Sequence, residues 1–178
     1  MRLSLAVLLI TAACNAAPHS QIDTVAAAAR AGDGPQIRQL VKEGHDPNAP
    51  SGGNGWTPLL HAVHTHQNAA IAALIDAGAD VNRPDGKSLT PLMMAAGYGY
   101  DDTVQLLLAR GADPRVLDLD GGTALDFAIF GMTDIDRWTF FDCQDSTVRL
   151  LRNAAPQVQP RPEARRWARI KRCASVSS

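Results

Sequence analysis

The sequence predicts an all-α protein, a solenoid of about four stacked helix-turn-helix repeats joined by short hairpin loops. Two observations carry this prediction. Thr57, Thr90 and Thr123 begin similar segments and follow one another at steps of 33 residues. The same step separates Gly78 from Gly111, and each of these glycines is followed by Ala-Asp. A fixed period of this length is typical of repeat proteins, in which each unit buries its apolar side against its neighbours.

Charge is divided unevenly along the chain of 178 residues, although the formal net charge is only −1. Residues 15–156 hold ten Lys or Arg against seventeen Asp or Glu, a net of −7, whereas residues 157–178 hold six against one, a net of +5. With 46% hydrophobic residues, the chain has enough apolar content for one folded domain. The composition therefore predicts an acidic body with a basic tail.

The first residues have the features of an export signal. Residues 1–13 place a basic residue, Arg2, before an apolar run at residues 3–10, which is shorter than the roughly 20 residues that span a membrane. The segment ends at Cys14 and resembles a bacterial lipoprotein signal, in which this cysteine carries a lipid and becomes the mature N-terminus. Cleavage after Ala16 is the alternative. Either route predicts export to the periplasm, and the lipid would anchor the chain to the outer membrane.

The four repeats are expected at residues 20–51, 52–84, 85–117 and 118–156. Thr57 is suited to cap a helix and Pro58 to occupy its first turn, where the missing N–H costs nothing. Gly78 is expected to end the second helix in a left-handed conformation, and Asp80 to support the turn that follows. The first repeat lacks the Thr-Pro-Leu segment and is predicted to be an N-terminal cap.

The recurring segments, Thr-Pro-Leu near the start and Gly-Ala-Asp near the end, resemble the ankyrin repeat. The resemblance covers residues 20–156 and implies antiparallel helix pairs, projecting hairpin loops and a groove that binds another protein. We therefore expect a protein partner, no cofactor, no nucleic acid, no enzyme activity and a monomer. An adaptor, an enzyme helper or an immunity protein of the bacterial cell envelope fits these features by analogy.

The fourth repeat departs from the period. Its second helix is displaced by about eleven residues, which predicts an insertion between its two helices near residues 131–143. After Pro156, which suits a helix end, the tail at residues 157–178 is first Pro-rich and then basic. A helix in the basic part would place Trp167 and Ile170 on one side and could dock on the acidic body or on a membrane surface. A frayed, solvated end is the alternative.

Two cysteines, Cys143 and Cys173, remain if Cys14 carries a lipid. In an oxidising compartment their thiols could pair. The sequence alone does not establish that they meet. A disulfide between them and two free thiols therefore stay open as alternatives.

The sequence contains no recognisable catalytic pattern. The strongest candidate for metal or ligand binding is a histidine cluster. His61 and His64 are three residues apart on one predicted helix and could share a metal ion or bind a small ligand. The repeat register favours another interpretation, with His61 packed inside, His64 at an exposed variable position and His66 at the turn between helices. Residues 118–121 begin like a calcium loop but lack its later ligands, so we expect a hairpin turn there and predict no metal site.

The expected contact surface for the partner consists of the hairpin tips and the adjoining faces of the first helices. Its predicted residues are Trp56, His64, Lys87, Leu89, Tyr98, Asp120 and Phe130. Trp56 and Leu89 are costly to leave in water, and Trp and Tyr are enriched among residues that carry binding energy. Trp56 could instead cover the N-terminal cap. A second candidate patch, in the insertion, consists of Trp138, Phe140 and Phe141.

Overall fold

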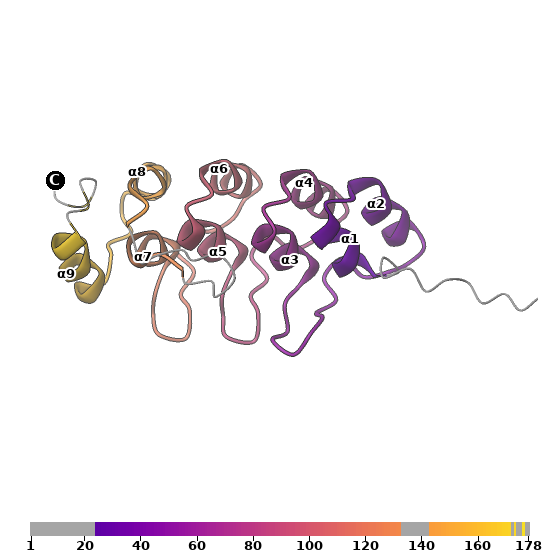
Figure 1. Ribbon diagram of the computed structural model, residues 1–178, viewed down its shortest axis with the longest axis horizontal. Coiled ribbons are helices and arrows are strands. Elements are labelled where there is room, and N and C mark those ends of the chain that lie inside the picture. The colour runs from indigo at the N-terminus through magenta and orange to yellow at the C-terminus, as the bar shows by residue number, and fades with distance from the viewer. Residues whose placement is uncertain (1–23, 133–142, 172, 174–175, 177–178) are drawn as a thin grey trace, which may run out of the picture.

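The computed structural model describes residues 24–132, 143–171, 173 and 176, and in this part of the chain every regular element is a helix (Figure 1). In chain order the helices are α1 (Val25–Ala31), α2 (Gly34–Lys42), α3 (Pro58–His64), α4 (Asn68–Asp76), α5 (Pro91–Tyr98), α6 (Asp101–Ala109), α7 (Ala124–Phe130), α8 (Asp145–Ala154) and α9 (Pro162–Lys171). The predicted all-α solenoid is confirmed. No helix within the described ranges is long and apolar enough to cross a membrane.

The first eight helices form two parallel rows. One row contains α1, α3, α5 and α7, and the other contains α2, α4, α6 and α8, with each helix of the first row packed against its successor in the second (Figure 1). Three long hairpin loops project from the first row, and α9 lies beyond α7 at the C-terminal end. This arrangement leaves the first row and its hairpins as one continuous side of the molecule.

Helices α3 and α5 begin as the sequence predicts. The hydroxyl of Thr57 accepts a hydrogen bond from the Leu60 N–H at 3.3 Å, and the hydroxyl of Thr90 accepts one from the Met93 N–H at 3.2 Å. In both cases the next residue is a proline at the first helical position. These caps satisfy N–H groups that have no partner within the helix, and so define where α3 and α5 start.

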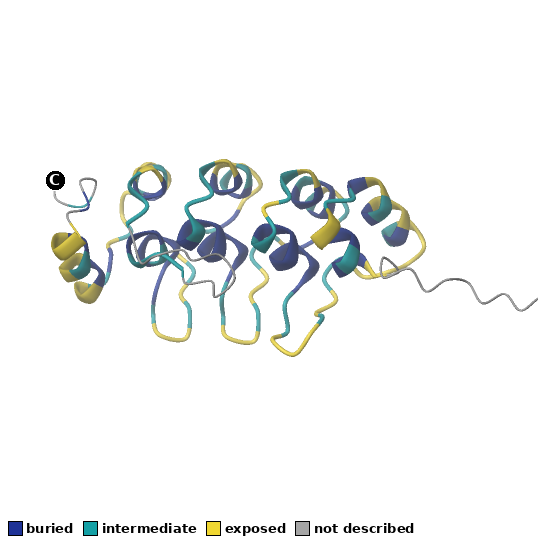
Figure 2. Ribbon diagram, viewed as in Figure 1, coloured by how far each residue is buried: buried dark blue, intermediate teal, exposed yellow. Residues whose placement is uncertain are grey.

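The core lies between the two rows of helices (Figure 2). The first row contributes small residues that are fully buried, among them Ala62, Ala95, Ala96 and Ala128, and these permit close helix packing. Larger apolar side chains fill the space between the rows: Leu60, Ile71, Leu74, Met94, Val104, Leu107 and Ile129. Each repeat therefore depends on its neighbours to bury its apolar side.

Hydrogen bonds from asparagine side chains join successive repeats. The Asn48 side-chain amide donates to the Gly78 carbonyl at 3.2 Å, and its oxygen accepts from the Asp80 N–H at 2.8 Å. Asn82 makes the same two bonds with the corresponding residues one repeat later. Gly78 has a φ of 95°, the left-handed conformation expected for it, and the Asp80 carboxylate accepts from the Asn82 N–H. The sequence analysis found the glycine and the aspartate but not the asparagine that connects the repeats.

The insertion of the fourth repeat starts close against α5. The Met132 N–H donates to the Gly97 carbonyl at 2.8 Å, and a Cβ atom at Gly97 would lie only 2.9 Å from the Met132 Cβ. Glycine is therefore required at position 97 for this close approach. The second candidate patch, Trp138, Phe140 and Phe141, lies outside the described residues, as does Cys14.

The basic tail forms helix α9, which packs against α7. Its buried side consists of Ala164 and Ala168, and Trp167 is half-buried, whereas Ile170 is 64% exposed. Trp167 and Ile170, three residues apart on this helix, lie on one side as the sequence predicts, but only Trp167 is partly covered. Small side chains on α9 allow its backbone to approach α7, and Ile170 points away from that contact. α9 thus covers the end of the solenoid.

A buried carboxylate connects α9 to the fourth repeat. Asp126 is 1% exposed, and its Oδ1 accepts a hydrogen bond from the backbone N–H of Arg161 at 2.8 Å. Its Oδ2 accepts from both the N–H and the hydroxyl of Thr123 at 2.9 Å. A buried charge is tolerated only with such partners. Asp126 therefore caps the start of α7 and also holds the segment that leads into α9.

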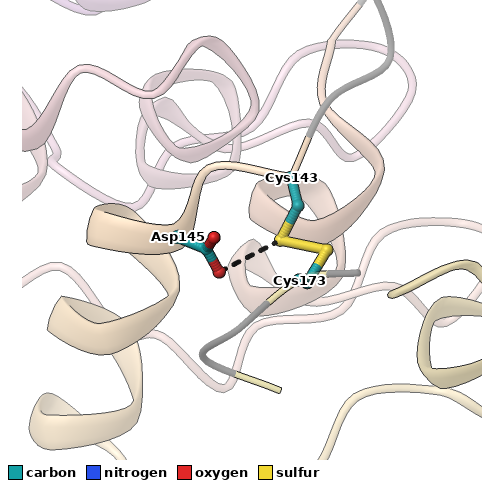
Figure 3. The surroundings of a disulfide bond; sticks show 3 residues. All are labelled: Cys143, Asp145 and Cys173. Carbon is teal, nitrogen blue, oxygen red and sulfur yellow. Dashed lines mark hydrogen bonds between the residues drawn. A yellow bond between two sulfur atoms is a disulfide. The ribbon is translucent and has the colours of Figure 1, made fainter. Parts of the chain in front are cut away.

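A disulfide bond joins Cys143 to Cys173 (Figure 3). Their Cα atoms are 5.8 Å apart, within the usual range for a bridge. The bridge connects the residue two before α8 with the residue two after α9, and the carboxylate of Asp145 lies beside it. The C-terminal cap is thus fixed covalently at one end and by Asp126 at the other.

Candidate protein-binding surface

Five ring side chains, which we call the aromatic row, follow one another across the second and third repeats. The Trp56 ring lies 5.0 Å from the His64 ring, measured between centroids, and the His64 Nδ1 is 3.0 Å from the Tyr98 hydroxyl oxygen. The Tyr98 ring lies 5.3 Å from that of Tyr100, which stacks on His66 at 4.0 Å with an interplanar angle of 6°. Trp56, His64 and Tyr98, three residues of the predicted contact surface, therefore lie together.

The repeat geometry explains why these rings meet. His64 and Tyr98 are the last residues of α3 and α5, two adjacent helices of the first row. His66 lies in the turn before α4 and has a φ of 56°, a conformation that favours glycine. Tyr100 lies directly before α6. The sequence analysis missed Tyr100 as a surface residue. The signal that could have found it is the 34-residue separation that relates His64 to Tyr98 and also His66 to Tyr100.

One end of the aromatic row carries charge. The His66 Nε2 is 2.9 Å from Asp102 Oδ1, and this hydrogen bond lowers the pKa of Asp102 below its usual value. The side-chain amide of Asn68 donates to the other carboxylate oxygen at 2.6 Å. The pair is solvent-exposed, so it orients His66 more than it stabilises the fold.

The second and third hairpins enclose a groove of about 450 Å³, which we call the hairpin groove. Its lining residues are Asp85, Lys87, Leu89, Asp118, Leu119, Asp120, Phe127 and Met132. The groove brings together Lys87, Leu89 and Asp120 from the predicted surface. Leu119 at its rim is 74% exposed, an apolar side chain that costs free energy in water.

Two aspartates hold the hairpins in shape. Asp85 Oδ1 accepts hydrogen bonds from the N–H groups of Lys87 at 2.8 Å and of Leu89 at 2.9 Å. Asp118 Oδ1 accepts in the same way from the two corresponding N–H groups of the next hairpin, at 3.0 and 2.6 Å. The resemblance of residues 118–121 to a calcium loop thus reflects a hairpin whose carboxylate binds backbone N–H groups.

Phe130, the seventh predicted surface residue, belongs neither to the aromatic row nor to the lining of the hairpin groove. It is the last residue of α7, and its ring lies 6.4 Å from that of Trp167 on α9. The Arg161 guanidinium lies 5.8 Å from the centre of the Phe130 ring. Phe130 is therefore part of the contact with the C-terminal cap.

His61 and His64 have different hydrogen-bond partners. His61 is 9% exposed, and its Nε2 is 2.9 Å from the Ser51 hydroxyl. Burial, together with the positive charge of Arg30, lowers the pKa of His61 to about 4, so the ring is neutral at neutral pH. The Nδ1 of His64 forms a hydrogen bond with the Tyr98 hydroxyl. No group of three or more His, Cys, Asp or Glu side chains in the described part of the chain is placed to hold a metal ion.

Comparison with known proteins agrees with this architecture. The family model for ankyrin repeats, comprising three copies, matches residues 25–118. The chain belongs to the ankyrin-repeat family. Ankyrin repeats are modules of protein–protein interaction, and this fold is generally a binding scaffold.

Several larger ankyrin-repeat proteins are similar to this chain. The rat (Rattus norvegicus) ankyrin repeat and SAM domain-containing protein 6 is 35% identical over 125 residues, which cover 67% of this chain and 13% of that protein. Inversin of Gallus gallus is 35% identical over 116 residues, 65% of this chain and 10% of inversin. Palmitoyltransferase akr1 of Neurospora crassa is 36% identical over 103 residues, 57% of this chain and 14% of the transferase. The chain spans about a quarter or less of the length of the curated relatives it matches.

Proposed function

We propose that this ankyrin-repeat protein binds a protein partner through the aromatic row and the hairpin groove. The observation that supports this most is the aromatic row, in which Trp56, His64 and Tyr98 hold one another in place while remaining partly exposed. Rings that are already ordered lose little conformational entropy on binding, so more of their buried area contributes to affinity. Trp and Tyr are also the residue types that most often dominate binding energy.

Substitution of the row tests the proposal. We expect Trp56→Ala and Tyr98→Ala each to weaken partner binding by about 1 kcal/mol or more. The partner would first be isolated by affinity capture from an envelope extract of the source organism, and its affinity then measured by calorimetry. Ile170→Ala, which removes an exposed apolar side chain from α9, is the matched control and should bind like the parent protein.

Unfolding measurements on the same variants distinguish a residue that contacts the partner from one that stabilises the fold. Trp56 also lies 5.4 Å from the His61 ring, so it has a structural alternative as a cover for the N-terminal cap. A contact residue loses binding with little loss of stability, and a cover residue does the reverse. If both variants bind the partner with parental affinity, the proposed surface is wrong.

We further propose that the chain acts in a bacterial cell envelope, exported and anchored by a lipid on Cys14. The apolar run at residues 3–10 and the small residues before Cys14 support this, and the disulfide between Cys143 and Cys173 suits an oxidising compartment. In that location the partner would be an enzyme that the protein assists, a toxin that it neutralises, or a component that it connects to others. The identity of the captured partner distinguishes these roles.

Replacement of the cysteine tests the anchor. We expect Cys14→Ser to remove the lipid mass from the mature protein and to shift the protein from the membrane fraction to the soluble fraction of the envelope. Envelope fractionation and mass spectrometry measure both effects. Unchanged membrane association, together with a mature N-terminus at Ala17, would show that cleavage follows Ala16 and that no lipid is attached.

A further inference from the structure

A second cavity, of about 440 Å³, lies at the C-terminal end of the solenoid, between α8, α9 and the segment that joins them. Its lining residues are Arg152, Gln159, Pro160, Arg165, Ala168, Arg169 and Val176. Three of these carry a guanidinium, and none of the described residues that line the cavity is acidic. The cavity shares no residue with the aromatic row or the hairpin groove, so it goes beyond the proposed function.

Arg161, which precedes α9, and the cations on α9 have different surroundings. Arg161 lies against the buried Asp126, and the Lys171 ammonium lies 5.4 Å from the centre of the Trp167 ring. Arg165 and Arg169 instead line the cavity, and within the described ranges no acidic side chain forms an ion pair with either of them.

Arg165 and Arg169 are four residues apart, so they lie on the same side of α9, where like charges repel. The Nε of Arg165 donates to the Pro160 carbonyl at 2.9 Å. This bond holds the guanidinium beside the cavity instead of leaving it free to turn into solvent. A bound anion would relieve the repulsion between the two arginines and use their remaining donors.

We propose that this cavity binds a phosphate-bearing ligand, either a small soluble phosphate ester or the headgroup of an anionic phospholipid. Guanidinium groups match phosphate oxygens in pairs of parallel hydrogen bonds, and the adjacent guanidinium groups of Arg165 and Arg169 suit such a charged group. The volume lies in the range of small-ligand sites. Pro160, Ala168 and Val176 add an apolar wall for the organic part of such a ligand.

Titration calorimetry tests the proposal, with pyrophosphate and glycerol 3-phosphate as soluble probes at low ionic strength. The full chain carries Cys14→Ser, so that no N-terminal lipid contributes. We expect saturable binding at one site, weakened about tenfold by Arg165→Gln and by Arg169→Gln, because each removes charged hydrogen bonds. Arg166→Gln is the matched control. It removes the same charge from the same helix, but Arg166 does not line the cavity, so it should change the affinity less than twofold.

Vesicle flotation distinguishes the two sources of phosphate. Binding to phosphatidylglycerol vesicles but not to phosphatidylcholine vesicles, lost in Arg165→Gln and Arg169→Gln, assigns the site to a lipid headgroup. Binding of the soluble probes without vesicle binding assigns it to a soluble ester. The proposal is overturned if neither the soluble probes nor the phosphatidylglycerol vesicles bind. It is also overturned if Arg166→Gln weakens binding as much as Arg165→Gln does, because attraction would then come only from the net charge of the tail. Melting temperatures of the three variants, expected to match the parent, show that they remain folded.

Discussion

Asp126→Ala is expected to lower the free energy of unfolding by about 3 to 5 kcal/mol, the range for removing one partner of a buried charged network. The substitution leaves the N–H groups of Thr123 and Arg161 without their acceptor in a buried place. It also removes the buried carboxylate near which the Arg161 guanidinium lies. Urea unfolding followed by circular dichroism measures the loss, and limited proteolysis measures whether α9 is released.

Two further variants make this result interpretable. Asp126→Asn keeps an oxygen acceptor of nearly the same shape, so it should lose less stability than Asp126→Ala. Asp120→Ala removes an exposed carboxylate from the neighbouring hairpin and should stay within about 0.5 kcal/mol of the parent. A loss below about 1 kcal/mol for Asp126→Ala would mean that the capping of α7 and the docking of α9 do not depend on this carboxylate.

The repeat architecture could be predicted because its determinants are local. The hydroxyls of Thr57 and Thr90 cap their helices by accepting hydrogen bonds from N–H groups three residues later. Gly78 adopts a left-handed conformation that few other residues adopt. Such requirements recur in each repeat and leave a period in the sequence. Asn48 recurs as Asn82 in the next repeat, but its hydrogen bonds go to atoms one repeat away, so the recurrence alone does not reveal its role.

The C-terminal cap could not be predicted in detail for the same reason. Ala164 and Ala168 are compatible with any helix, and only the packing of α9 on α7 makes them buried. Trp167 and Ile170 are the more apolar residues, and their spacing predicts a shared side of the helix but not which of them is covered. Asp126 also gave no signal, because the residue that it holds, Arg161, is 35 positions further along the chain.

The candidate surface shows both the strength and the limit of reasoning from repeat positions. His64, Tyr98 and Phe130 are the last residues of α3, α5 and α7, and the sequence analysis therefore placed them on one face. The first two contact each other. Phe130 occupies the repeat that adjoins α9, so its ring lies near Trp167 of the cap and not near the aromatic row. Position within a repeat predicts the face on which a residue lies, but not what else packs there.

Removal of the disulfide is expected to lower the free energy of unfolding by about 3 to 4 kcal/mol, because the bridge closes a loop of 30 residues and so restricts the unfolded chain. The variant is Cys143→Ser combined with Cys173→Ser, which avoids an unpaired thiol. Urea unfolding of the parent with and without reductant measures the effect, and the double variant is the control, since reductant should not change it. The bridge links the residue that follows the end of α9 to the segment that precedes α8, so reduction should also speed proteolytic removal of the tail. Equal stability of oxidised and reduced parent protein would show that Asp126 and the packing of Ala164 and Ala168 are enough to hold the cap in place.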